Sequence, residues 1–149
     1  MPAFISIGRF LFCVYFVFSG ATKLLDLAAT TQIAQRVTVP AMLASYTAQL
    51  EAYAGMPFPQ LLALSAGIVQ VVCGILIALN FGARFFALIL IVYLGAVIFY
   101  YHDFWNQSGA GASRELVLAL IDLALIGGLM VIAGIGRGPR VVETAYNDV

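Results

Sequence analysis

One apolar stretch, Gly74–Trp105, constrains the fold of this chain more than any other feature. It reads GILIALNFGARFFALILIVYLGAVIFYYHDFW, which is two apolar runs separated by a short turn at Asn80–Arg84. A water-soluble domain of 149 residues could hardly bury so much apolar sequence on both sides of one turn. In a lipid bilayer the same stretch is an ordinary helical hairpin, because each run is long enough to cross the hydrocarbon core. The rest of the chain is interpreted as completing this hairpin into a membrane bundle.

The composition of the whole chain agrees with this interpretation. Hydrophobic residues make up 63% and charged residues only 9%, whereas soluble domains carry about 25% charged residues. Basic and acidic residues balance at seven each with no basic run, so a nucleic-acid partner is not expected. Cys13 and Cys73 lie far apart within apolar runs and belong to no CxxC motif or Cys/His cluster. We expect both to be buried as small apolar side chains, and we expect this chain to hold no metal and no cofactor other than a quinone.

Four segments are apolar over the roughly 20 residues that a membrane-spanning helix needs. They are residues 4–25, 58–79, 84–101 and 116–135. The sequence therefore predicts an all-α, integral membrane four-helix bundle that forms a single domain over residues 1–149. Both termini then share one side with the Asn80–Arg84 turn. That side carries Arg9, Arg84, Arg137 and Arg140, and the other carries Lys23, Arg36 and Arg114. The positive-inside rule predicts that both termini are cytoplasmic.

The first outer loop contains an amphipathic pattern between Pro40 and Gly55. Proline suits the first turn of a helix and glycine suits its end. One face of this helix carries the apolar stripe Leu43, Tyr46, Leu50 and Tyr53. The pattern predicts a short helix that lies on the outer membrane surface, against a partner, or as a lid over its own bundle. In the second outer loop, Asn106–Ser113 is expected to be a flexible connector, with Ser113 as the N-cap of the fourth helix.

Ionisable residues inside spanning helices are costly, so each is a candidate functional residue. Asp122 lies about two turns into the fourth helix from its outer end, on the same face as Glu115. Lys23 and His102 are expected near the outer surface, so either can reach Asp122. Two interpretations stay open. In one, which we favour, the contact is a structural clasp between helices. In the other, it is a proton or quinone-headgroup site near the outer leaflet.

The remaining polar and small residues have simpler interpretations. Gln70 lies in the middle of the second span, and Gly67 and Gly74 flank it on the same face. Small residues let helices approach closely, so that Gln70 can form a hydrogen bond across the interface. The pair Gly127–Gly128 is expected to act in the same way on the fourth span. Arg9 is expected to extend from the inner end of the first span to the lipid headgroups.

Several short motifs in order resemble the DoxX family. Phe18–Asp26, which reads FSGATKLLD, is similar to the FSGxxKLxD-type signature that closes the first helix of that family. Gly67–Gln70, followed by Gly74 and the turn Gly82–Arg84, is similar to the family's second helix and basic turn. His102–Trp105 resembles its HDFW corner. The resemblance covers most of the chain, from residue 12 to about residue 138.

The resemblance implies a small four-helix protein of the bacterial inner membrane, with lipid and other membrane subunits as partners. Members of the family have been linked to membrane oxidoreductase systems, including a thiosulfate:quinone oxidoreductase. The sequence departs from the family pattern in two places. Gln70 stands where the family often has an acidic residue, which weakens a proton-handling role at that position. Pro40–Gly55 looks like an insertion, which suggests docking to a partner specific to this protein.

Two functions therefore stay open. In the first, the chain is a non-catalytic or quinone-side membrane subunit of a larger oxidoreductase or electron-transfer complex, whose redox centre belongs to a partner. In the second, it is a stand-alone quinone-linked oxidoreductase component with a polar site near the outer leaflet. The candidate site residues in either case are Lys23, Asp26, His102 and Asp122. A small transporter is a weaker hypothesis, because the sequence shows no inverted repeat or broken-helix pair.

Overall fold

The computed structural model describes residues 2–35, 37, 39, 41–102 and 109–135, and this part of the chain contains only helices. They are α1 (Pro2–Leu25), α2 (Leu27–Ala34), the 3-10 helix η1 (Ala41–Leu43), α3 (Ala44–Ala54), α4 (Phe58–Ala78), α5 (Ala83–Tyr101) and α6 (Ala110–Ile135). Four of these helices, α1, α4, α5 and α6, are long and apolar enough to cross a membrane. The predicted all-α, four-span architecture is confirmed. Asp103–Trp105, Arg36 and the tail after Ile135 lie outside the described residues.

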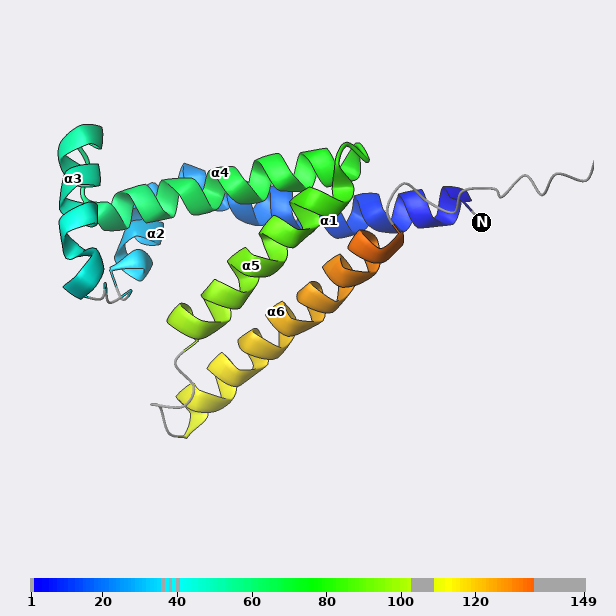
Figure 1. Cartoon of the computed structure of the whole chain (residues 1–149). Helices are drawn as coiled ribbons and strands as arrows, with labels where there is room; N and C mark the ends of the chain where they lie inside the picture. Colours follow the sequence, from blue (N-terminus) through cyan, green and yellow to red (C-terminus); the bar gives the residue numbers. More distant parts are fainter. Residues whose placement is uncertain (1, 36, 38, 40, 103–108, 136–149) are drawn as a thin grey trace, which may run out of the picture.

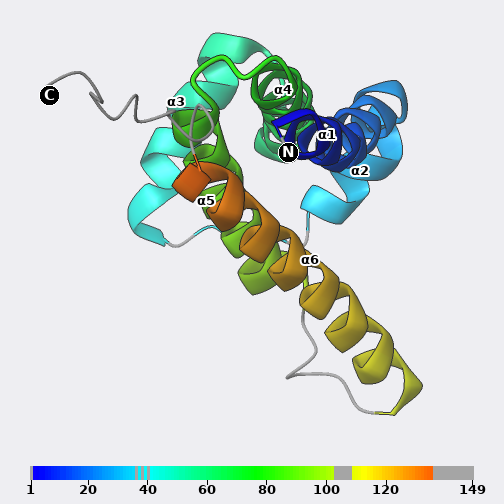
Figure 2. The same cartoon turned by 90° about the vertical axis from the view of Figure 1, so that its right-hand side faces the viewer.

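The four spans form two helix pairs (Figure 1). Helix α1 packs along α4, α5 packs along α6, and α4 and α5 follow each other through a tight turn. The pairs cross and then diverge toward the end where α2 and α3 lie, as both views show (Figures 1 and 2). We call this end the α3 end. The start of α1, the α4–α5 turn and the end of α6 lie at the opposite end, which we call the Asn80 end. Which end faces the cytoplasm stays a prediction.

Glycines allow the helices to approach closely. A Cβ atom on Gly20 would lie 2.8 Å from the carbonyl oxygen of Gly67, so α1 and α4 touch backbone to backbone. On Gly74 it would lie 3.0 Å from a side chain of α1. The predicted role of Gly67 and Gly74 is confirmed. On α6, a Cβ atom added to Gly128 would lie 2.6 Å from the ring of Phe12 on α1, whereas one added to Gly127 would have nothing within 4 Å. The prediction is therefore confirmed for Gly128 and wrong for Gly127, which faces away from the bundle.

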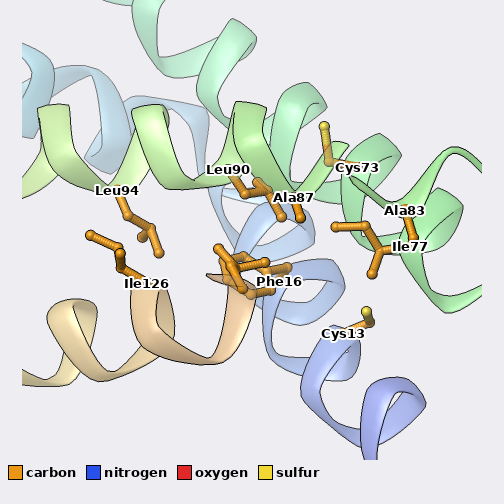
Figure 3. Close-up of a cluster of buried hydrophobic side chains, with 10 residues drawn as sticks. Cys13, Phe16, Cys73, Ile77, Ala83, Ala87, Leu90, Leu94 and Ile126 are labelled. Atoms are coloured by element: carbon orange, nitrogen blue, oxygen red, sulfur yellow. The ribbon is translucent and has the colours of Figure 1, made fainter. Parts of the chain in front are cut away.

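The core lies where the two helix pairs cross (Figure 3). Its buried members are Cys13, Phe16, Cys73, Ile77, Ala83, Ala87, Leu90, Leu94, Ile126 and Leu129, which come from all four spans. Both cysteines are free and buried here, as predicted. Many large apolar side chains on the outer faces of the spans remain exposed. Such faces are suited to lipid, because apolar side chains are favourable in hydrocarbon and a helix satisfies its backbone hydrogen bonds internally.

The turn at the Asn80 end is closed by a Schellman motif. The N–H of Phe81 donates to the carbonyl of Leu76, and the N–H of Asn80 donates to the carbonyl of Ile77. Asn80 has a φ of 59°, the left-handed conformation that asparagine tolerates better than most residues. Its side-chain oxygen accepts a hydrogen bond of 2.8 Å from Nη1 of Arg9. Arg9 therefore fastens α1 to the turn, which differs from the expected extension to lipid headgroups.

Two boundaries near the α3 end differ from the sequence predictions. Helix α2 was not predicted; Asp26 is its N-cap and accepts a hydrogen bond of 3.1 Å from the N–H of Ala29. Helix α6 begins at Ala110, several residues before the predicted start of the fourth span. Ser113 lies inside it and its hydroxyl reaches the carbonyl of Gly109, so the predicted N-cap role is wrong. The small, alanine-containing segment extends the helix beyond its apolar part, because alanine favours helix strongly.

The predicted helix in the first outer loop is confirmed, and it borders its own bundle, because Leu43 and Thr47 line a space together with α4 and α5. It comprises η1 and α3 and ends at Gly55, which has a φ of 66°. The polar side of α3 faces its own bundle, since Glu51 Oε1 accepts a 2.7 Å hydrogen bond from the N–H of Phe58 at the start of α4. The apolar stripe is largely exposed, although Leu43 also lines the space shared with α4 and α5: its members are Leu43, Tyr46, Leu50 and Tyr53, from 49% to 96% exposed. The stripe therefore stays available to lipid or to a partner.

Candidate functional site

A cavity of about 210 Å³ lies where the two helix pairs meet. All four spans contribute to its lining, which consists of Tyr15, Lys23, Gln70, Tyr93, Leu94, Val97, His102, Leu118, Ile121 and Asp122. We call it the polar cavity. Three of the four predicted site residues, Lys23, His102 and Asp122, therefore line one space.

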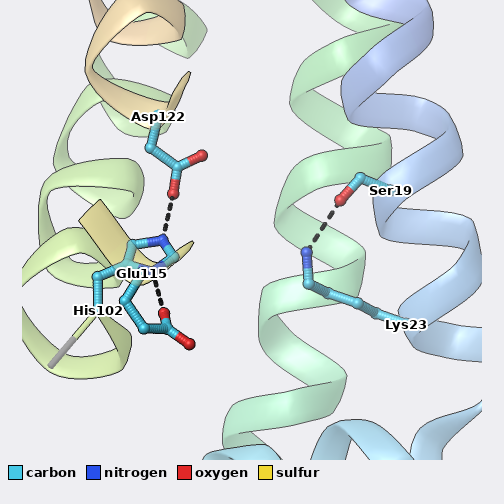
Figure 4. A network of polar contacts seen from close by, with 5 residues as sticks. All are labelled: Ser19, Lys23, His102, Glu115 and Asp122. Atoms are coloured by element: carbon cyan, nitrogen blue, oxygen red, sulfur yellow. Dashed lines mark hydrogen bonds and ion pairs between the residues drawn. The ribbon is translucent and has the colours of Figure 1, made fainter. Parts of the chain in front are cut away.

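On one wall, His102 lies between two carboxylates (Figure 4). It directly follows α5, and its Nε2 is 3.1 Å from Oδ2 of Asp122, while its Nδ1 is 3.0 Å from Oε2 of Glu115. The two acidic residues are about two turns apart on one face of α6, so the imidazole bridges them. The predicted contact between His102 and Asp122 is confirmed. Glu115 was not among the predicted site residues, although its shared face with Asp122 was the signal for it.

Each of the two contacts needs a hydrogen-bond donor, which limits how protons can be arranged among the three groups. A neutral imidazole carries one N–H, and an ionised carboxylate can only accept hydrogen bonds. Both ring nitrogens of His102 nevertheless contact carboxyl oxygens. Two protons shared among the three groups satisfy both contacts, either as an imidazolium with two carboxylates or as a neutral imidazole with one protonated carboxyl group. In both cases the group, which we call the acid–His–acid triad, carries one net negative charge.

The opposite wall belongs to α1 and α4. The Nζ atom of Lys23 donates to Oε1 of Gln70 at 2.6 Å and to Oγ of Ser19 at 3.0 Å (Figure 4 draws the second bond). Of the two contacts considered for Asp122, the one with Lys23 does not form: within the described residues no ion pair joins them, because Lys23 bonds on its own side of the cavity. An ammonium group has three N–H donors, and these two bonds use two of them. In the described part of the chain, the third N–H has no acceptor.

Gln70 joins this wall as a residue that the predicted site did not include. It is only 2% exposed and lies in the middle of α4. As an uncharged acceptor, it positions the Lys23 ammonium without neutralising its charge. Asp26, by contrast, is exposed, caps α2 and lines no part of the polar cavity. It is the one predicted site residue that the fold does not bring to the others.

Two further spaces, both apolar, adjoin the polar cavity. One of about 320 Å³ lies between α3, α4 and α5, and one of about 190 Å³ borders α2. Tyr93 and Val97 line all three spaces, so the three spaces lie side by side. The hydroxyl of Tyr93 has no hydrogen-bond partner in the described part of the chain. A polar space with a few donors next to apolar space suits a ligand that has a polar headgroup and an apolar tail.

Four apolar spans around a polar cavity define a multi-pass membrane protein. The family model of DoxX matches residues 4–103, and the chain belongs to the DoxX family. The chain is also 26% identical over 137 residues to inner membrane protein YphA of Escherichia coli (strain K12), a match that covers 92% of this chain and 86% of that protein. No solved structure matches the chain significantly.

The family match covers only part of the candidate site. It includes Lys23, Gln70 and His102 but ends before Glu115 and Asp122. The lysine wall and the imidazole therefore lie within the segment that the family model describes. The two carboxylates that hold the imidazole come from α6, outside that segment.

Proposed function

We propose that this chain is the quinone-side membrane subunit of a larger bacterial oxidoreductase or electron-transfer complex, and that the polar cavity receives the quinone headgroup. The observation that carries the proposal is the polar cavity itself, with apolar spaces directly beside it. A quinone ring has two carbonyl oxygens that accept hydrogen bonds, and its side chain is apolar. The third N–H of Lys23 and the hydroxyl of Tyr93 are suitable donors, and the adjoining spaces suit the side chain.

Reduction of a quinone to a quinol takes up two electrons and two protons. We assign the redox centre to a partner subunit, because the best ligand groups of this chain are engaged elsewhere: its one histidine contacts two carboxylates, and both cysteines lie in the apolar core. This chain would then bind and orient the quinone and exchange its protons. If a soluble donor supplied the electrons instead, the same cavity would serve a stand-alone quinone-linked component, which is the alternative.

We also assign the α3 end to the outer side of the bacterial inner membrane. Arg9 and Arg84 lie near the Asn80 end, which favours a cytoplasmic location for that end and for both termini. The relative YphA is named an inner membrane protein. The polar cavity would then be nearer the outer leaflet.

Lys23→Met is expected to weaken quinone binding. Hydrogen bonds to charged groups contribute about 1.5–3 kcal/mol, so the loss should be tenfold or more in Kd. The test is equilibrium binding of a short-chain quinone to the purified protein in mild detergent. Asp26→Asn is the matched control, because Asp26 is exposed and asparagine caps helices as well as aspartate does. The proposal is wrong if the unaltered protein binds no quinone, or if a folded Lys23→Met variant binds as tightly.

We propose that the apolar stripe of α3 contacts the partner subunit. Tyr53→Cys should resist an impermeant maleimide in native membranes and react with it after purification, because the partner covers the stripe. Ala52→Cys, exposed beside it on α3, should react from the outer side in both states. Cys13 and Cys73 are buried and contribute little background.

Each other pattern of labelling has a definite meaning. Reaction of Tyr53→Cys in native membranes would exclude the partner contact. Protection of the same residue in liposomes of the purified protein would show that lipid covers the stripe. Reaction of Ala52→Cys only after permeabilisation would reverse the assigned orientation.

A further inference from the structure

The acid–His–acid triad extends from the protein surface to the polar cavity. The side chain of Glu115 is 24% exposed, whereas those of His102 and Asp122 are each 11% exposed. Asp122 and His102 line the polar cavity and Glu115 does not. The three groups are thus ordered from water to cavity, with the imidazole in the middle.

We infer that the triad is a proton relay between the surface at the α3 end and the polar cavity. A proton from water binds Glu115 and passes from Oε2 to Nδ1 of His102. The imidazole then gives the proton on its Nε2 to Oδ2 of Asp122, which delivers it to the quinone in the cavity. One proton enters at Glu115 and one leaves at Asp122, and only O–H and N–H bonds form and break. Histidine suits the middle position because its two nitrogens can accept and donate at the same time.

A purely structural clasp would need fewer charged groups. One carboxylate is enough to fix the imidazole at the end of α5, and burying a second one adds a desolvation cost. The other polar groups that line the polar cavity with His102 and Asp122 are Lys23 and Tyr15 on α1, Gln70 on α4 and Tyr93 on α5. Of these only Lys23 carries a positive charge, which offsets the single negative charge of the triad across the cavity. The relay can therefore hold its two shared protons in a cavity without net charge.

The chain has a single histidine, so ¹⁵N-histidine labelling gives one imidazole to observe by NMR. In the unaltered protein both ring nitrogens should show the shifts of protonated or hydrogen-bonded nitrogens and should exchange with solvent. Glu115→Gln keeps the length of the side chain and an acceptor for Nδ1 but cannot carry a proton. It should slow this exchange by about 100-fold or more, the usual size of a general acid–base contribution. Glu51→Gln is the control, because Glu51 also accepts a hydrogen bond at the α3 end but lies outside the triad.

A second readout uses quinone turnover in the native complex. Glu115→Gln and Asp122→Asn should both lower kcat and change its pH profile, while the quinone Kd of Glu115→Gln stays unchanged. Unaltered imidazole exchange in Glu115→Gln would overturn the relay.

The direction of proton flow rests on the proposed function, but the two fail separately. Imidazole exchange that depends on Glu115, in a protein that binds no quinone, would support the relay and contradict the proposed quinone binding. Quinone binding together with imidazole exchange that is insensitive to Glu115 would support the quinone proposal and contradict the relay.

Discussion

Gly20→Ala is expected to force α1 away from α4 and to destabilise the protein by about 1–3 kcal/mol, the usual cost of overpacking. The added Cβ atom would lie 2.8 Å from the carbonyl oxygen of Gly67 and 2.8 Å from Cγ2 of Val71. A backbone carbonyl inside a helix cannot move aside as a side chain can, so the whole helix must shift. Lys23 follows one turn later on α1, and its bond to Gln70 should loosen at the same time.

The measurement is unfolding in mixed detergent, followed by far-UV circular dichroism, together with quinone affinity. Gly127→Ala is the matched control, since a Cβ atom there meets nothing within 4 Å and alanine favours helix more than glycine does. That variant should be as stable as the unaltered protein or slightly more stable. Equal destabilisation by both substitutions would contradict the close contact between α1 and α4.

His102→Leu is expected to have the largest effect on stability among variants of the site. It removes the imidazole from two carboxylates and leaves Asp122, only 8% exposed, without its partner. Removing one partner of a buried ion pair typically costs about 3–5 kcal/mol. Glu115 should contribute less to this cost, because its more exposed side chain can be hydrated again.

The double variant His102→Leu/Asp122→Leu distinguishes this explanation from a simple loss of packing. It removes the stranded carboxylate together with the imidazole, so much of the lost stability should return. Thermal unfolding of the single and double variants in the same detergent provides the comparison. If the double variant were as unstable as the sum of the two single changes, the pair would not be energetically coupled.

The fold was largely predictable because the length of an apolar run decides whether a helix can cross a bilayer. The predicted spans agree with α1, α4 and α5 to within about two residues. The start of α6 was missed because a helix can continue beyond its apolar part. Helix α2 was missed because its sequence, LAATTQIA, has no clear apolar periodicity, although its N-cap, Asp26, was present in the sequence.

The site was predictable only within one helix pair. His102 and Asp122 lie on consecutive spans and at similar depths, so their contact followed from topology. The partner of Lys23 depends on how close α1 lies to α4 and how far the two pairs diverge, which no periodicity encodes. Likewise, the amphipathic pattern of α3 predicted the apolar stripe but not which side of the helix faces the bundle. That side is set by the hydrogen bond that Glu51 accepts from the start of α4.

The two walls of the polar cavity belong to different helix pairs. Lys23 and Gln70 belong to the α1–α4 pair, and the triad belongs to α5 and α6, which diverge from the first pair toward the α3 end. A molecule that touches both walls therefore binds best at one crossing angle of the two pairs and, by linkage, favours that angle. Bilayer thickness acts on the same angle, since helices tilt to match the hydrocarbon core. If the proposed quinone binds here, its affinity should therefore depend on the thickness of the membrane, even though no lipid needs to contact the ligand.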